Sequence, residues 1–224
     1  MSEIFCPMIT AMRYHTIVFI PVLLLCLFGC AHKPEEIKSA EVLFHEATKL
    51  AEQKKVEKAT ETFMEVRTYY PGHDLARKSL IAIAEINFEE KLYDEAMESY
   101  KEYRLLYPTD PEAGDSLYKI GLCYFNQIST YDRDQSNTAQ AISILEEFIN
   151  TYPNSPYAEQ AREKLVDART TMAKHYLYIG KFYLKNKNLE AACKRFNYVR
   201  RQYPDIDVGE DLDDLIAKSC KDAP

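Results

Sequence analysis

The residue types that usually bind metals or perform catalysis occur in this chain, but their spacing forms no known catalytic motif. The five histidines are His15, His32, His45, His73 and His175. None forms an H-E-x-x-H helix, and no G-x-S-x-G element or glycine-rich phosphate loop is present. Asp132, Asp134 and Ser136 alternate as calcium ligands do, but the glycine and glutamate that complete a calcium loop are missing. We therefore predict no catalytic site, no metal site and no cofactor, which favours an interaction protein.

Cys30 stands at the end of an apolar segment near the amino terminus. Arg13 precedes a run over residues 16–28 that is too short to cross a bilayer but suits a signal peptide. The run ends in Leu27-Phe28-Gly29-Cys30, which resembles a bacterial lipobox except that Phe28 is bulkier than its usual occupant. We expect a lipoprotein signal peptide over 1–29, a lipid on Cys30 and a short tether over 30–39. A plain secretory signal with an incidental cysteine stays open.

The net charge bears on the class of partner, and the remaining cysteines bear on disulfide bonding. The formal net charge is −7, and Glu3 and Arg13 cancel within the predicted signal peptide. An acidic chain without a basic stripe argues against nucleic acid as a partner. Cys123, Cys193 and Cys220 are an odd number, which gives no disulfide framework. A bridge between Cys193 and Cys220 stays open, and separate thiols are favoured.

Four stretches share one ladder of alanine, two large apolar residues, tyrosine and proline at steps of four, three, four and one. They are Ala59-Phe63-Val66-Tyr70-Pro71, Ala96-Tyr100-Tyr103-Tyr107-Pro108, Ala141-Leu145-Phe148-Tyr152-Pro153 and Ala192-Phe196-Val199-Tyr203-Pro204. These steps place the side chains on one face of a helix that ends at the proline. Four copies in one register indicate a stacked helical repeat.

A second pattern lies upstream of each ladder, with its small residue twelve positions before the ladder alanine. In the fourth copy it reads Tyr176-Ile179-Gly180-Tyr183. Together the two patterns resemble the tetratricopeptide repeat, a helix–turn–helix of about 34 residues. The resemblance implies an all-α solenoid of four full repeats, with repeats one to three over 40–155 and a second part over 156–224.

The spacing between ladders predicts two insertions and a capping helix. A polar stretch, 126–138, is expected to form a protruding loop inside repeat three. Apolar residues from Tyr157 to Tyr183 keep steps of four and three, which predicts one linking helix of about 28 residues before repeat four. Ser155 and Pro156 fit its start. Leu212, Leu215 and Ile216 form the apolar side of a short capping helix.

The concave surface can be assigned by repeat register, through the resemblance to tetratricopeptide proteins. The positions that line the groove in that family include Phe44, Ile81, Phe88, Tyr118 and Phe125. An aromatic floor of this kind suits an extended peptide with aromatic side chains. The alternative is that these residues pack between helices and are closed to ligands.

The chain is similar to one family of tetratricopeptide lipoproteins, the BamD family of the β-barrel assembly machine. Three stretches carry the similarity: 131–135 in the insertion, 152–157 before the long helix, and 175–185 followed by 191–196. Members usually have five repeats, and this chain is expected to contain four and half of a fifth. The resemblance implies a scaffold anchored by lipid at the periplasmic face of the outer membrane. It also implies docking on the POTRA domains of the barrel insertase BamA, receipt of unfolded outer-membrane protein precursors, and accessory lipoproteins as further partners.

The partner interface is expected on repeat four, where Arg195, Lys194, Arg200 and Arg201 form a basic edge. Helical geometry turns Arg195 away from the buried Phe196, toward solvent. Arg195 also aligns with an arginine that BamD proteins use against an acidic residue of the last POTRA domain. Two other functions stay open: a pilotin-like lipoprotein that escorts a secretin, and a periplasmic coordinator of the cell envelope.

Overall fold

The computed structural model describes residues 37–220, and all regular structure within that range is α-helical. The helices are α2 (Ala40–Glu52), α3 (Val56–Tyr69), α4 (Asp74–Glu89), α5 (Tyr93–Leu106), α6 (Glu112–Asn126), α7 (Ser136–Thr151), α8 (Ala158–Lys185), α9 (Leu189–Gln202) and α10 (Leu212–Cys220). The expected signal peptide, Cys30 and most of the tether lie outside the described residues. The all-α class is confirmed.

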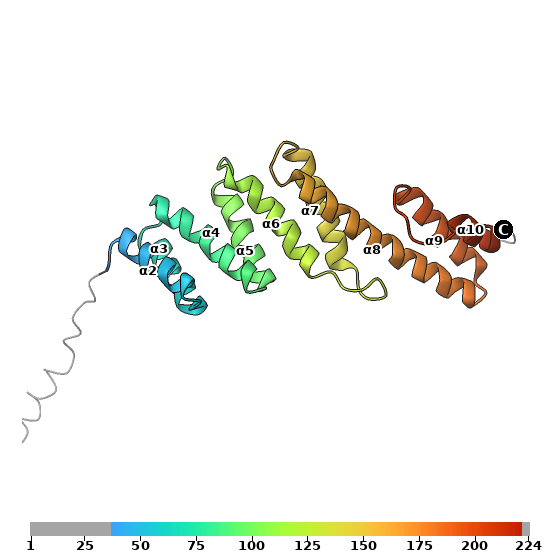
Figure 1. The fold of residues 1–224 in the computed structure, drawn as a ribbon, viewed down its shortest axis with the longest axis horizontal. Coiled ribbons are helices and arrows are strands. Elements are labelled where there is room, and N and C mark those ends of the chain that lie inside the picture. Colours follow the sequence, from blue (N-terminus) through green and yellow to red (C-terminus); the bar gives the residue numbers. More distant parts are fainter. Residues whose placement is uncertain (1–36, 221–224) are drawn as a thin grey trace, which may run out of the picture. The chain divides into compact units, whose positions relative to one another are not determined.

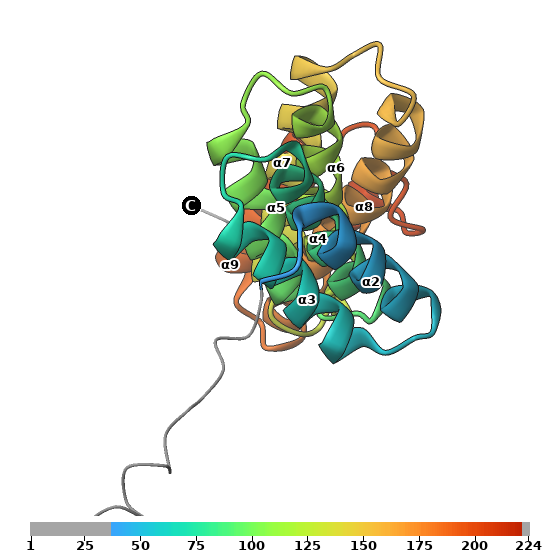
Figure 2. The same ribbon diagram turned by 90° about the vertical axis from the view of Figure 1, so that its left-hand side faces the viewer.

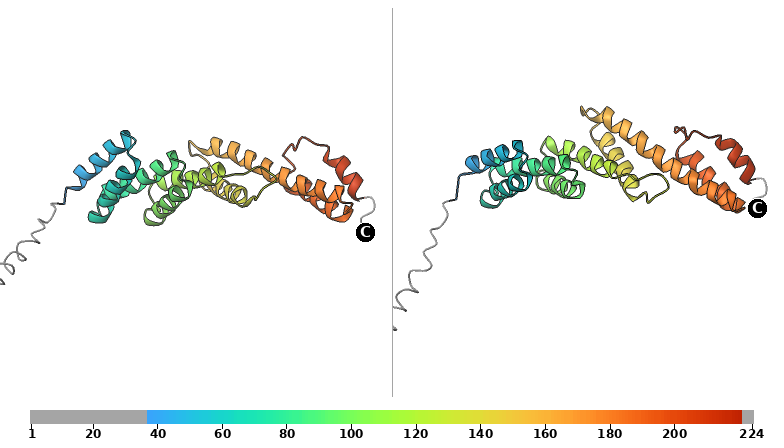
Figure 3. Two further views of the ribbon diagram at one scale, coloured as in Figure 1. Left: turned by 90° about the horizontal axis from the view of Figure 1, so that it is seen from below. Right: turned by 60° about the horizontal axis from the view of Figure 1, so that its bottom comes forward.

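Residues 39–220 form one compact unit in which each helix packs against the next along the chain. The order is four antiparallel pairs, α2–α3, α4–α5, α6–α7 and α8–α9, followed by α10 (Figures 1 and 3). Figure 2 looks along this stack from the end that carries α2. The core is therefore a series of small apolar clusters, each shared by neighbouring helices.

The ladder residues form the centre of these clusters. The four ladder alanines, Ala59, Ala96, Ala141 and Ala192, are each 0% exposed, and the two large residues that follow each of them are at most 2% exposed. The tyrosine that closes each ladder caps its helix and donates its backbone N–H to the carbonyl four residues earlier, as Tyr107 does to Tyr103 at 2.8 Å. All four caps have φ between −126° and −132°, because a following proline disfavours helical backbone.

Small residues on the first helix of a pair let the second helix cross closely. Ala47 and Ala84 occupy this place in the first two pairs and are fully buried. At Gly180, a Cβ atom would lie 2.5 Å from Cε1 of the Phe196 ring. The glycine is therefore required by the close approach of α8 and α9.

The insertion in the third pair is shorter and more firmly held than the sequence predicts. Asn126 ends α6 and α7 begins at Ser136, so only residues 127–135 lie between the helices. Gln135 is buried, and its Nε2 donates to the backbone carbonyls of Thr130 and Arg133 at 2.9 and 3.1 Å. Thr138, which was expected in the loop, is buried in α7 and donates to Oε1 of Gln135 at 2.7 Å. The loop is therefore a structured element.

The long helix α8 has 28 residues, the length that the apolar period predicts. It begins two residues after Pro156, because residues 156 and 157 form a turn in which the backbone N–H of Tyr157 donates to Oγ of Ser155 at 3.2 Å. The first half of α8 packs on α7 and α6, and the second half packs on α9. One continuous helix thus joins the third and fourth pairs.

The carboxyl-terminal helix α10 covers the exposed side of α9. Leu212, Leu215 and Ile216 pack on the buried cluster around Phe196, as expected of a capping helix. The expectation of separate thiols is wrong for Cys193 and Cys220, which form a disulfide with their Cα atoms 5.2 Å apart. Packing of α10 on α9 brings these two cysteines together, which a count of cysteines does not reveal.

Candidate interaction surfaces

A hollow of about 490 Å³ lies between the first two helix pairs. Its walls come from α2, α3, α4 and the turn between α2 and α3. The lining residues are Phe44, Thr48, Ala51, Glu52, Lys54, Phe63, Ala82, Glu85, Ile86 and Glu89. Phe44 is half-buried and meets Phe63 edge to face, with ring centroids 5.3 Å apart. Of the five residues expected on the groove floor, Phe44 alone is among those lining this hollow.

Three of the other expected floor residues are half-buried and already engaged. Ile81 packs on the cluster around Tyr100. Phe88 meets Tyr93 with ring centroids 5.7 Å apart, and Nζ of Lys119 lies 4.9 Å from the Phe88 centroid. Nζ of Lys164 lies 4.8 Å from the centroid of the Phe125 ring. Lysines therefore cover two of these aromatic faces.

Tyr118 differs from the expectation, because its side chain is buried in the core. It is 4% exposed, stacks on Tyr157 with centroids 5.1 Å apart, and meets Phe148 at 5.3 Å. Its hydroxyl donates to Oε1 of Gln160 at 3.3 Å, and burial raises the pKa of Tyr118. The cap and first turn of α8 supply Tyr157 and Gln160, and close this position to a ligand.

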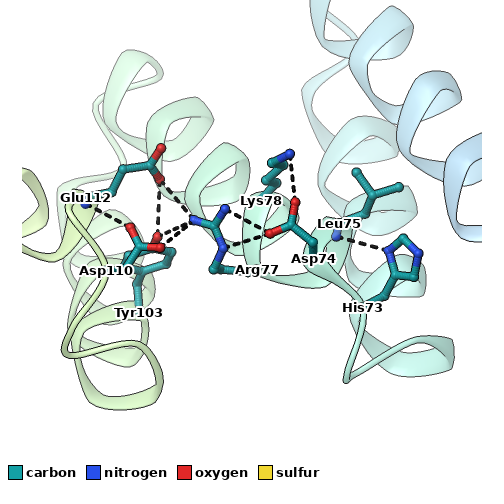
Figure 4. Close-up of polar contacts among 8 residues, drawn as sticks. All are labelled: His73, Asp74, Leu75, Arg77, Lys78, Tyr103, Asp110 and Glu112. Carbon is teal, nitrogen blue, oxygen red and sulfur yellow. Dashed lines mark hydrogen bonds and ion pairs between the residues drawn. The ribbon is translucent and has the colours of Figure 1, made fainter.

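A charged network joins three helices of the second and third pairs (Figure 4). The Arg77 guanidinium donates to the Tyr103 hydroxyl at 2.8 Å and pairs with Asp110 at 2.9 Å and with Asp74 at 3.0 Å. The hydrogen bond to Tyr103 contributes most to raising the pKa of Arg77. Asp110 also accepts from the backbone N–H of Glu112 at 2.9 Å. The network fixes α4 against α5 and the start of α6. Tyr103 and Asp110 are too distant from Arg77 in sequence for a local motif to reveal these contacts.

The basic edge expected on α9 is divided by pairing within the chain. Lys194 is exposed and pairs with Glu190, and Arg200 pairs with Asp213 of α10. Arg201 is exposed and has no ion-pair partner within residues 37–220.

Arg195 is less exposed than helical geometry alone predicts. It is half-buried, and its guanidinium carbon lies 5.7 Å from the centroid of the Tyr176 ring. Tyr176 in turn packs on Tyr198, with centroids 4.4 Å apart. The aromatic pair thus restrains Arg195 at the surface.

The insertion loop contacts the middle of α8, which sequence reasoning missed. Nδ1 of His175 lies 2.7 Å from the carbonyl oxygen of Tyr131, and the rings of Tyr131 and Tyr178 meet edge to face with centroids 5.9 Å apart. Both tyrosines are exposed at the surface, as is Phe182 one turn further along α8. The polar composition of the loop gave no signal for this contact.

Within residues 37–220, no group of three or more histidine, cysteine, aspartate or glutamate side chains is arranged to hold a metal ion. None of the described helices combines the length and apolar composition needed to cross a membrane.

Comparison with known proteins places the chain in a family. A family described as "YfiO: Outer membrane lipoprotein" matches residues 36–218. The "Outer membrane protein assembly factor BamD" of Caulobacter vibrioides is 31% identical over 177 residues, which cover 76% of this chain and 58% of that protein. The protein of the same name from Rickettsia prowazekii is 30% identical over 182 residues, covering 80% of this chain and 72% of that protein. Among solved structures, a thermophilic TPR protein of Thermus thermophilus is 16% identical, with 81% of this chain and 99% of that chain covered and a TM-score of 0.41.

The chain spans less than two thirds of the Caulobacter protein's length. The family match nevertheless includes every described helix except the last two residues of α10. The family expected from the sequence is thus confirmed: the chain belongs to the YfiO/BamD family of outer membrane lipoproteins.

Proposed function

We propose that this chain is a periplasmic scaffold of the machinery that assembles β-barrel proteins in the outer membrane. Membership in the family and the names of its relatives support the assembly role. The stack of helix pairs supports the scaffold role, because such arrays offer extended surfaces on a rigid frame. The lipobox-like pattern at Cys30 supports a lipid anchor at the periplasmic face of that membrane.

The hollow between the first two helix pairs is the observation that carries a precursor-binding role. Its apolar lining includes the open part of Phe44 together with Ala82 and Ile86. The volume of about 490 Å³ lies within the range of ligand pockets and has room for an aromatic side chain. Full burial of one phenylalanine stabilises a complex by about 1.5–3 kcal/mol. We therefore assign this hollow to an aromatic residue of an unfolded outer-membrane protein segment.

Filling the hollow tests this role without removing a packed side chain. Ala82→Phe places a ring in the hollow, and a peptide with a carboxyl-terminal phenylalanine should then bind the full chain about tenfold more weakly by fluorescence anisotropy. Ala139→Phe, on the exposed surface of α7, makes the same exchange outside the hollow and should leave the affinity unchanged. Equal peptide affinity of the wild type and Ala82→Phe would contradict the assignment of this hollow to a precursor.

Docking on a BamA-like insertase is assigned to the surface around Arg195. The Tyr176 ring holds the guanidinium, so that less side-chain freedom is lost when Arg195 pairs with an acidic residue of a POTRA domain. Arg201, which has no ion-pair partner within the described range, adds positive charge on the same helix. This surface lies on α9, whereas the hollow lies on α2 to α4, so the two roles can be separated by mutation.

A further inference from the structure

A second groove, of about 520 Å³, runs along α3 and is separate from both proposed surfaces. Its lining residues are Val56, Glu57, Thr60, Glu61, Met64, Glu65, Thr68, Tyr69, Asn87 and Leu92. They come from α3, the end of α4 and the residue before α5. None of them lines the hollow that contains Phe44, because α3 presents a different face here.

The groove combines exposed apolar side chains with charge of one sign. Met64, Tyr69 and Leu92 are 52%, 50% and 43% exposed, a concentration of large apolar surface that a solvated helix face does not need. Glu57, Glu61 and Glu65 add three carboxylates at four-residue spacing, and the lining contains no basic residue.

The three carboxylates have no ion-pair partner within residues 37–220. The dipole of α3 favours Glu57 in the first turn, but it does not favour Glu65 near the other end. Like charges at four-residue spacing destabilise a helix. The stripe therefore has no stabilising role in the isolated chain, which is a reason to look for a cationic partner.

We propose that the groove along α3 binds a cationic amphipathic helix of a partner protein. Lysine or arginine at four-residue spacing on that helix would face Glu57, Glu61 and Glu65, since the rise per turn is the same in both helices. Its apolar side would cover Met64, Tyr69 and Leu92, in the way that amphipathic helices generally occupy apolar grooves. The proposal does not depend on the precursor or insertase roles.

The test uses the full chain in detergent and a synthetic helical peptide with lysines at four-residue spacing beside a leucine face. Isothermal titration should give a dissociation constant on the order of micromolar that weakens as salt is added. The variant Glu61→Lys should lose about tenfold or more in affinity. Glu163→Lys, at an exposed glutamate of α8 outside the groove, is the matched control and should change it little.

A second peptide separates specific docking from attraction to an acidic protein. With serines in place of the leucines, it keeps the charge and should bind at least tenfold more weakly, because Met64 and Leu92 would stay uncovered. Met64→Ser should weaken binding of the peptide with leucines and leave binding of the peptide with serines unchanged. Equal binding of both peptides, or equal loss in Glu163→Lys and the groove variant, would overturn the proposal. Self-association of the wild type that the groove variant abolishes would also overturn the proposal, because the groove would then be an interface between two copies of this chain.

Discussion

Replacing Gly180 with alanine should destabilise the packing of α8 on α9. The new Cβ atom would lie 2.5 Å from Cε1 and 2.8 Å from Cδ1 of Phe196. Non-bonded carbon atoms pack best at about 3.5–4.0 Å, so the overlap is about 1 Å. The Phe196 ring is 0% exposed, so it is not at the surface, where it could move aside into solvent. Overpacking costs about 1–3 kcal/mol, and an overlap this large on a buried ring lies in the upper part of that range, at about 2–3 kcal/mol. Alanine regains about 1 kcal/mol of helix propensity, so we expect a net loss of about 1–2 kcal/mol.

Urea denaturation followed by circular dichroism measures this loss, and two other glycines calibrate it. Gly121→Ala should cost less, because the nearest atom is the end of the flexible Leu145 side chain at 2.9 Å. Gly72→Ala, with no heavy atom within 4 Å of the new Cβ, should stay within about 0.5 kcal/mol of wild type. A Gly180→Ala protein as stable as the Gly72→Ala protein would refute the claim that glycine is needed for this crossing.

Three further predictions concern the anchor, the docking surface and the disulfide. Cys30→Ser should release the chain from outer-membrane vesicles, and mass spectrometry that finds no lipid on the wild type would contradict the anchor. Arg195→Glu should weaken binding to a BamA-like insertase by about 2–5 kcal/mol in a pull-down titration. Lys194→Glu should have a small effect, because Lys194 is already paired with Glu190. Equal effects of the two variants would contradict the docking site. The Cys193–Cys220 bridge closes a separation of 27 residues, so its reduction should lower the free energy of unfolding by about 3–4 kcal/mol. Reduction should also speed hydrogen exchange in α10. Unchanged exchange in α10 would show that packing alone holds this helix.

Much of the fold could be predicted from the sequence because repeated local chemistry determines it. The alanine at the start of each ladder and the tyrosine–proline at its end fix where the second helix of each pair packs and stops. The uninterrupted apolar period after Pro156 gave the length of α8, since a loop would not keep a helical phase.

The candidate site was less predictable, because it depends on which helix covers which residue. Tyr118 was placed on a concave floor by repeat register, yet the inserted start of α8 brings Tyr157 over it. Arg195 was expected in open solvent, but its neighbour across the helix pair is an aromatic ring. The disulfide and the contact between Tyr131 and α8 join residues 27 and 44 positions apart, which no local pattern encodes.

The most direct test of the assembly role is the set of proteins that accompany the chain in its own membranes. The tagged full-length chain would be purified in mild detergent from native outer membranes, and its partners identified by mass spectrometry. We predict recovery of a β-barrel insertase with periplasmic POTRA domains, lost or reduced in the Arg195→Glu protein. Recovery of a secretin without the insertase would contradict the assembly role and favour a pilotin-like escort.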